Sequence, residues 1–145
     1  MNVDFADNTI LIDDENSMEA ITRHLLEDHK FTDLFYVSGI KGHPDAVKRL
    51  NCFKRILKEY GMELTEDNLF HGDFWRNCGD QVVDEILERR DDKLPQAIVC
   101  ANDYMAAGSL SAFLELGVKV PEDISIFGFD DAEVASNSSP TLSTI

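Results

Sequence analysis

The fold is decided by the stretch from Ala97 to Asp131, which reads AIVCANDYMAAGSLSAFLELGVKVPEDISIFGFDD. Residues 96–101, entered through Pro95, are typical of a strand buried on both faces of a sheet, and residues 124–128 form a second such strand. Between them lies an apolar helical pattern that stops at Gly117. We expect its inward face to carry Met105, Ala106, Leu110, Phe113 and Leu116. A strand, a helix and another strand in this order form a βαβ unit, whose strands are parallel.

The same alternation extends toward both ends of the chain. Strands are predicted at residues 9–12, 34–37 and 68–71, and residues 141–145 are expected to be extended. Helices are predicted after residue 13, at 45–60 and at 77–90. Their expected inward residues are Met18, Ile21, Leu25 and Leu26 in the first, Ala46, Leu50, Phe53, Leu57 and Tyr60 in the second, and Val82, Val83, Ile86 and Leu87 in the third. Residues 1–145 are therefore predicted to form one doubly wound α/β domain, a parallel sheet between two helical layers.

The net charge of −15, from 28 acidic and 13 basic residues, argues against direct binding to nucleic acid, because such a surface repels phosphates. No apolar run reaches the roughly 20 residues of a membrane-spanning helix. The first residues show no export signal. We therefore expect a cytoplasmic protein that does not enter a membrane.

Cysteine and histidine spacing predicts neither a disulfide framework nor a metal site. The three cysteines, Cys52, Cys78 and Cys100, form no CxxC pair, and the four histidines show no HExxH spacing. Catalytic signatures such as GxSxG or a glycine-rich phosphate loop are missing as well. The sequence thus favours binding over catalysis and predicts no catalytic residue, metal or cofactor.

A ligand site is expected beyond the carboxyl ends of the strands, where doubly wound sheets bind their ligands. Those ends deliver residues 39–41, 72–75, 102–103 and 130–131. Their carboxylates, amide and adjacent aromatic rings suit a neutral, polyhydroxylated ligand. Other interpretations remain for the same residues. Either Asn102 or Asp103, with Asp103 favoured, would cap the following helix and leave the other for a ligand. The rings of Phe74 and Trp75 could equally be packing, and the spacing alone makes Arg49 a solvated side chain.

The stretch from Ala97 to Asp131 also resembles the effector-sensing domain of the lactose/galactose-repressor (LacI/GalR) family of bacterial transcriptional regulators. Members show a strand that ends in AND, a helix with MA-G, then G--VP-D, and a strand that ends in GFDD or GYDD. Weaker similarities lie at residues 48–53, 71–74 and 140–145. The chain departs from the pattern at Cys52, where the family has glycine, at Asp28, where it has the glycine of GH, and in its tandem aromatic pair.

The resemblance implies a type I periplasmic-binding-protein-like fold and a small-molecule effector such as a sugar. Arg49, Phe74, Asn102 and Asp130 match positions where the family contacts its effector, and either ring of the pair Phe74–Trp75 could form the aromatic wall. The resemblance therefore favours a ligand contact for Arg49 over a solvated side chain.

Family members have a two-lobed sensing domain, and this chain resembles most of one lobe. Contact with DNA would require an N-terminal domain outside the chain. The resemblance also implies a homodimer formed through residues 104–116 and 132–138.

Two alternatives belong to other functional classes. Residues 9–15, TILIDDE, are similar to the first strand and acidic pair of a phosphorylation-receiver domain, but the later strands do not supply a receiver's aspartate and lysine. A purely structural interpretation of residues 13–16 is that they cap the start of a helix and place negative charge there. A sugar-binding transport protein would share the fold, although VPEDISIFGFDD is more typical of the regulators.

Overall fold

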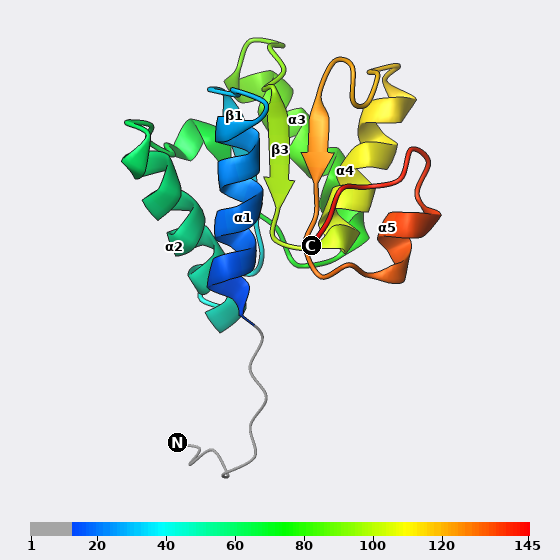
Figure 1. Ribbon diagram of the computed structural model, residues 1–145. Helices are drawn as coiled ribbons and strands as arrows, with labels where there is room; N and C mark the ends of the chain where they lie inside the picture. The colour runs from blue at the N-terminus through cyan, green and yellow to red at the C-terminus, as the bar shows by residue number, and fades with distance from the viewer. Residues whose placement is uncertain (1–12) are drawn as a thin grey trace.

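Four parallel strands form the centre of the protein, whose computed structural model describes residues 13–145 (Figure 1). Their order across the sheet is β2-β1-β3-β4. The strands are β1 (Leu34–Ser38), β2 (Leu69–His71), β3 (Ala97–Cys100) and β4 (Ser125–Phe127). Every residue of the two central strands, β1 and β3, is buried, as expected for a sheet covered on both faces. The predicted strand at residues 9–12 lies outside the described residues.

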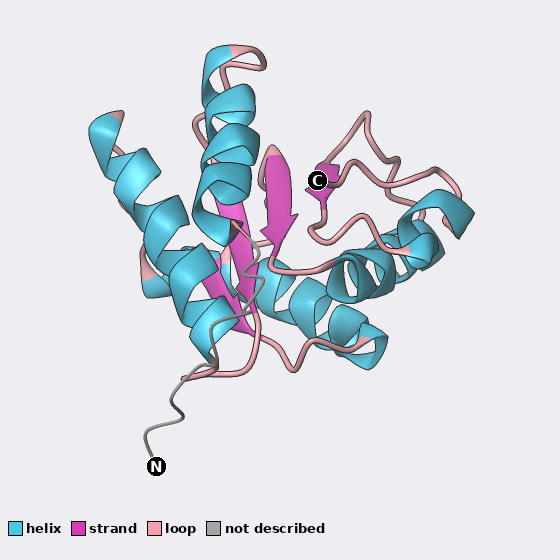
Figure 2. Ribbon diagram, turned by 60° about the horizontal axis from the view of Figure 1, so that its bottom comes forward, coloured by secondary structure: helices cyan, strands magenta, loops and turns pink. Residues whose placement is uncertain are grey.

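Helices cover both faces of the sheet, so the predicted three-layer, doubly wound α/β fold is confirmed (Figure 2). Helices α1 (Asp14–Glu27) and α2 (Pro44–Glu59) pack together on one face, and α3 (Gly79–Arg89) and α4 (Asp103–Glu115) pack together on the other. Two short 3-10 helices, η1 (Glu66–Asn68) and η2 (Arg76–Cys78), precede β2 and α3. A five-residue helix, α5 (Glu133–Asn137), was not predicted; it packs against α4.

The inward faces of the helices are largely the predicted ones. In α4, Met105, Ala106, Leu110 and Phe113 are each at most 2% exposed. The prediction of a buried position is wrong for two residues, because Leu116 is 60% exposed and Tyr60 is 41% exposed. Both are the C-cap residues of their helices, where the chain turns away and the helical periodicity no longer sets the side-chain direction.

The C-terminal residues run beside β4 without forming a full strand. Phe127 and Ser143 form an isolated parallel bridge, in which the Gly128 amide donates to the Ser143 carbonyl at 2.8 Å. The Asp130 amide donates to the Ile145 carbonyl at 2.9 Å. The end of the chain therefore holds the loop after β4 from outside the sheet. Within residues 13–145, no helix is both long and apolar enough to cross a membrane.

Candidate functional site

Arg49 is the centre of an ion-pair cluster at the carboxyl ends of the strands. Its Nε and Nη2 bind the Asp14 carboxylate at 3.0 and 2.9 Å, and its Nη1 donates to the Ala101 carbonyl at 2.6 Å. Nη2 also lies 3.1 Å from Oδ1 of Asp130. The guanidinium carbon sits 3.9 Å from the centre of the Phe129 ring, a cation–π contact. Arg49 is only 5% exposed, so the solvated side chain that its spacing suggested is wrong.

Asp14 is the site residue that sequence reasoning missed. It is 5% exposed and begins α1, 35 residues before its partner Arg49. The predicted capping of this helix start is confirmed for Asp13, whose carboxylate accepts from the Asn16 amide at 3.2 Å. Nothing in the local pattern distinguishes a capping aspartate from one that turns inward. The signal that could have found Asp14 is the need of a buried arginine for a carboxylate.

Asn102 joins the second part of the site, formed with Phe74. Its Oδ1 accepts from the Met105 amide at 3.0 Å, so Asn102 caps α4 and the favoured cap, Asp103, is wrong. Its Nδ2 donates to the Phe74 carbonyl at 2.9 Å. Phe74 has a φ of 70°, a conformation that non-glycine residues rarely adopt. Asn102 thus holds the loop after β2 against the start of α4.

The two adjacent aromatic side chains face different surroundings. The Phe74 ring packs directly on Gly39, where a Cβ would lie 2.0 Å from a ring carbon, and the ring centre is 5.2 Å from that of His43. Trp75 is 64% exposed, with its ring centre 6.3 Å from that of Tyr104. Phe74 therefore lies over the loop that follows β1, whereas Trp75 lies toward α4.

Asp130 occupies a turn that points its carboxylate at Arg49. It has a φ of 101°, and its neighbour Asp131 has a φ of 45°. The Asp130 side chain is 39% exposed, so it reaches both Arg49 and solvent. Partial burial raises the pKa of Asp130, and the nearby Arg49 guanidinium opposes that rise. The carboxylate is thus the member of the cluster that a ligand hydroxyl can approach.

The structure brings four of the five predicted residues into two linked pairs. Arg49 pairs with Asp130, and Asn102 pairs with Phe74; the Arg49 bond to the Ala101 carbonyl, directly before Asn102, connects them. Trp75 stands at the margin of this group. Two carboxylates face one guanidinium here, which favours a ligand that donates hydroxyl hydrogens over an anion.

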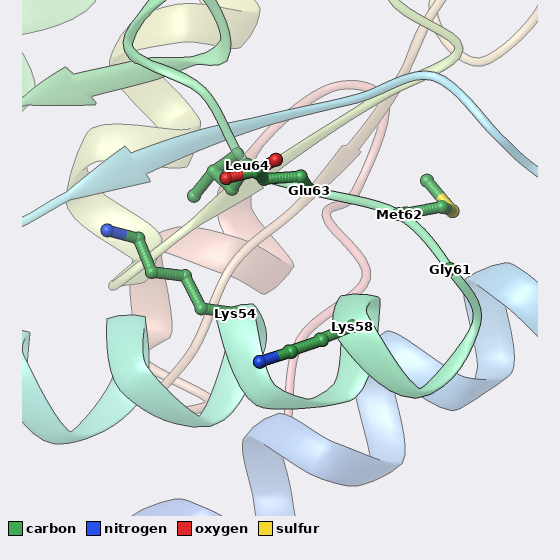
Figure 3. Close-up of a pocket in the computed structure, with 6 residues that line it drawn as sticks. All are labelled: Lys54, Lys58, Gly61, Met62, Glu63 and Leu64. Atoms are coloured by element: carbon green, nitrogen blue, oxygen red, sulfur yellow. The ribbon is translucent and has the colours of Figure 1, made fainter.

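The surface also has hollows that lie away from Arg49, Phe74, Asn102 and Asp130. One of about 500 Å³ lies beside α2, where Lys54 and Lys58 line one side and residues 61–64 line the other (Figure 3). Another of about 290 Å³ adjoins it near the edge strand β2. Across residues 13–145, no three histidine, cysteine or acidic side chains gather as metal ligands. Cys52, Cys78 and Cys100 are buried and unpaired, and burial raises the pKa of each thiol.

Comparison with known proteins identifies the family. Residues 22–145 match the periplasmic binding protein-like domain. The chain belongs to this family. The resemblance to the effector-binding domains of LacI-family regulators is confirmed, since the relatives in sequence are transcriptional repressors and the structural relatives include regulators named as members of the LacI family.

Three of these relatives show the extent of the similarity. The HTH-type transcriptional repressor PurR of Histophilus somni is 37% identical over 142 residues, which cover 97% of this chain. A sugar-binding transcriptional regulator of the LacI family from Escherichia coli, complexed with phosphate, superposes with a TM-score of 0.85 at 30% identity, covering 93% of this chain and 48% of that one. The regulator CelR, in complex with cellobiose, has a TM-score of 0.83 at 27% identity, covering 92% and 40%.

The chain spans less than half the length of the relatives that it matches in sequence. It covers 42% of the Histophilus repressor. The comparisons are with regulators and give no support to the receiver-domain alternative, whose motif lies mostly in the residues that the structure does not describe.

Proposed function

We propose that the chain is one lobe of the effector-sensing domain of a cytoplasmic transcriptional regulator, and that it binds rather than transforms its ligand. The observation that carries this is the Arg49–Asp130 pair at the carboxyl ends of the strands, with one carboxylate still open to solvent. The named relatives are transcriptional regulators, and one of them is a complex with a sugar. The transport alternative has the same fold, but the relatives named here favour regulation.

The ligand we propose is a neutral, hydroxyl-rich small molecule such as a sugar. Asp130 would accept hydrogen bonds from its hydroxyl groups, and Arg49 would donate to its oxygens. Asn102 would contribute its remaining amide hydrogen, since its other polar groups already bind the Met105 amide and the Phe74 carbonyl. Phe74 would cover the apolar face of the ring, and Trp75 would extend that wall.

Thermal unfolding with a panel of mono- and disaccharides (cellobiose included), sugar phosphates and nucleobases tests this proposal. A ligand at 100 times its dissociation constant adds about 2.7 kcal/mol of stability. We expect one neutral sugar to stabilise the chain and the effect to disappear in Asp130→Ala. Asp123→Ala is the matched control, because that carboxylate accepts only the Lys119 amide in a distant turn. Equal stabilisation of both variants, or stabilisation by none of the panel, would contradict the proposed site.

We also propose that the chain forms a homodimer through residues 104–116 and 132–138, and that DNA is contacted only through a further N-terminal domain. Within the first of these segments, Tyr104, Leu114 and Leu116 are exposed, although most of α4 is buried. The segment that contains α5 packs beside α4, so the two form one surface. The net charge of −15 supports leaving DNA contact to another domain.

Sedimentation velocity tests the dimer. Leu116→Glu is expected to shift the chain to monomer, because the charge would have to be buried in the contact. Val47→Glu serves as the control, since Val47 is also an exposed apolar residue, at 42% against 60% for Leu116, but lies on α2. A chain that is monomeric at high concentration, or a dimer that survives Leu116→Glu, would refute this interface.

A further inference from the structure

Asp103 is a fully buried carboxylate that the proposed ligand contacts do not use. It is the first residue of α4 and is 0% exposed. The positive end of the helix dipole favours a carboxylate there, but burial still raises the pKa of Asp103. One oxygen, Oδ1, has no hydrogen-bond partner among the described residues. Such a buried and incompletely satisfied group calls for an explanation.

Asp103 brackets the turn that carries Asp130. Its backbone amide donates to the Phe129 carbonyl at 2.9 Å, just before the turn. Its Oδ2 accepts from the Ala132 amide at 2.7 Å, just after the turn. The two residues between these anchors, Asp130 and Asp131, both have positive φ angles. Because non-glycine residues rarely hold such angles unaided, both ends of the turn need to be fixed.

The surroundings of Asp103 are shaped to admit its carboxylate. A Cβ on Gly128 would lie 1.9 Å from Oδ1, so only glycine leaves room for the side chain at this point. The Thr144 hydroxyl helps to stabilise the carboxylate and accepts a hydrogen bond from the Asp131 amide at 3.1 Å. The buried carboxylate therefore meets the turn from the α4 side, while the C-terminal segment meets it from the other.

We propose that Asp103 is a positioning residue of the effector site, which fixes the Asp130–Asp131 turn so that Asp130 faces Arg49. Asp103 forms no hydrogen bond or ion pair with Arg49 and is 0% exposed. It acts through the turn, and its charge adds to the effect of burial by raising the pKa of Asp130 through repulsion between the two carboxylates. The inference extends the proposed function, since it assigns a role toward a ligand-contacting residue. The coupling of Asp103 to the Asp130–Arg49 pair can be measured without any ligand.

The test measures two signals in the full chain by NMR without added ligand. The first is hydrogen exchange of the Ala132 amide, which we expect to be about tenfold faster in Asp103→Ala, since one charge-assisted hydrogen bond is lost. The second is the Arg49 Nη2 resonance, from the group that faces Asp130, which we expect to shift in Asp103→Ala in the same direction as in Asp130→Asn. Asp103→Asn keeps one carbonyl oxygen for the Ala132 amide and should restore most of the protection.

Controls separate positioning from a general loss of stability. Exchange at Ile98 and Val99 in β3 should stay near its wild-type rate, and Asp123→Asn should change neither signal. Acceleration of β3 and Ala132 by the same factor, or an Arg49 resonance that does not move in Asp103→Ala, would overturn the proposal. If Asp103→Ala does not fold, Thr144→Val and Asp103→Asn decide it. Thr144→Val removes the hydroxyl that supports both the Asp103 carboxylate and the Asp131 amide, so the Arg49 resonance should move in it and much less in Asp103→Asn; no shift in Thr144→Val would overturn the proposal. Neither variant requires a ligand, so failure here is distinct from failure of the proposed function.

Discussion

Replacing Arg49 by methionine should destabilise the chain far more than any other change at the site. Methionine retains most of the side-chain volume but removes every polar contact. Asp14, which is 5% exposed, would then be a buried carboxylate without its cation, and the Ala101 carbonyl would lose its donor. Removing one partner of a buried ion pair costs about 3–5 kcal/mol. That is a large share of the roughly 5–15 kcal/mol by which domains are stable.

The comparison with Asp130→Asn makes the prediction quantitative. The Asp130 side chain is 39% exposed, so its ion pair with Arg49 is screened by solvent and should contribute only about 0.2–1 kcal/mol. The free energy of unfolding should therefore fall several times further in Arg49→Met than in Asp130→Asn. For a chain of this length, the larger loss corresponds to roughly 10–20 °C in Tm.

Urea unfolding followed by far-ultraviolet circular dichroism measures both variants. Asp14→Asn combined with Arg49→Met completes a double-mutant cycle, in which removal of the orphaned charge should recover part of the loss. A cost below about 1 kcal/mol for Arg49→Met, or a cost no greater than that of Asp130→Asn, would refute the claim that Arg49 is held chiefly by Asp14.

Three further changes have clear expected results. Tyr36→Phe removes a fully buried hydroxyl that has no partner among the described residues, so urea unfolding should show unchanged stability or a gain of up to about 1 kcal/mol; a larger loss would reveal a hidden hydrogen bond. Gly128→Ala places a Cβ against Oδ1 of Asp103 and should cost about 1–3 kcal/mol in the same assay, and a neutral result would show that the turn is free to move. Burial raises the pKa of Asp103, so the folded state binds this proton more tightly than the unfolded state and the carboxylate's contribution to stability falls as pH rises. The stability of wild type relative to Asp103→Asn should therefore decrease as the pH rises above about 4, and a difference that stays constant would contradict the shift.

The elements of the fold could be predicted because their signals are local. Alternation of strands with amphipathic helices locates β1, β3 and α4, and Gly61 and Gly117 mark where two helices end. The prediction of buried side chains fails at the helix ends, as for Leu116. Periodicity describes a continuing helix, and the cap residue no longer follows it. The short α5 has too few residues for a periodic pattern to be recognised.

The site was predictable in composition but not in its pairings. Parallel strands bring their carboxyl ends to one edge, which is why residues from four loops could be expected together. The buried state of Arg49 depends on Asp14, whose helix begins on another part of the chain. Whether Asn102 or Asp103 caps α4 depends on the Ala132 amide, which lies 29 residues from Asp103 and donates to its carboxylate. Such choices between equivalent local partners are decided by tertiary contacts.

Trp75 allows the edge of the site to be followed by fluorescence. It is the single tryptophan of the chain, 64% exposed and directly after Phe74, with Tyr104 as its aromatic neighbour. Its emission should be red-shifted and readily quenched by acrylamide, because the indole is in contact with water. Anything that covers this edge, whether a ligand or another part of a regulator, would exclude that water and shift the emission to the blue. The chain thus carries an intrinsic fluorescent probe at the place where its proposed function would be exercised.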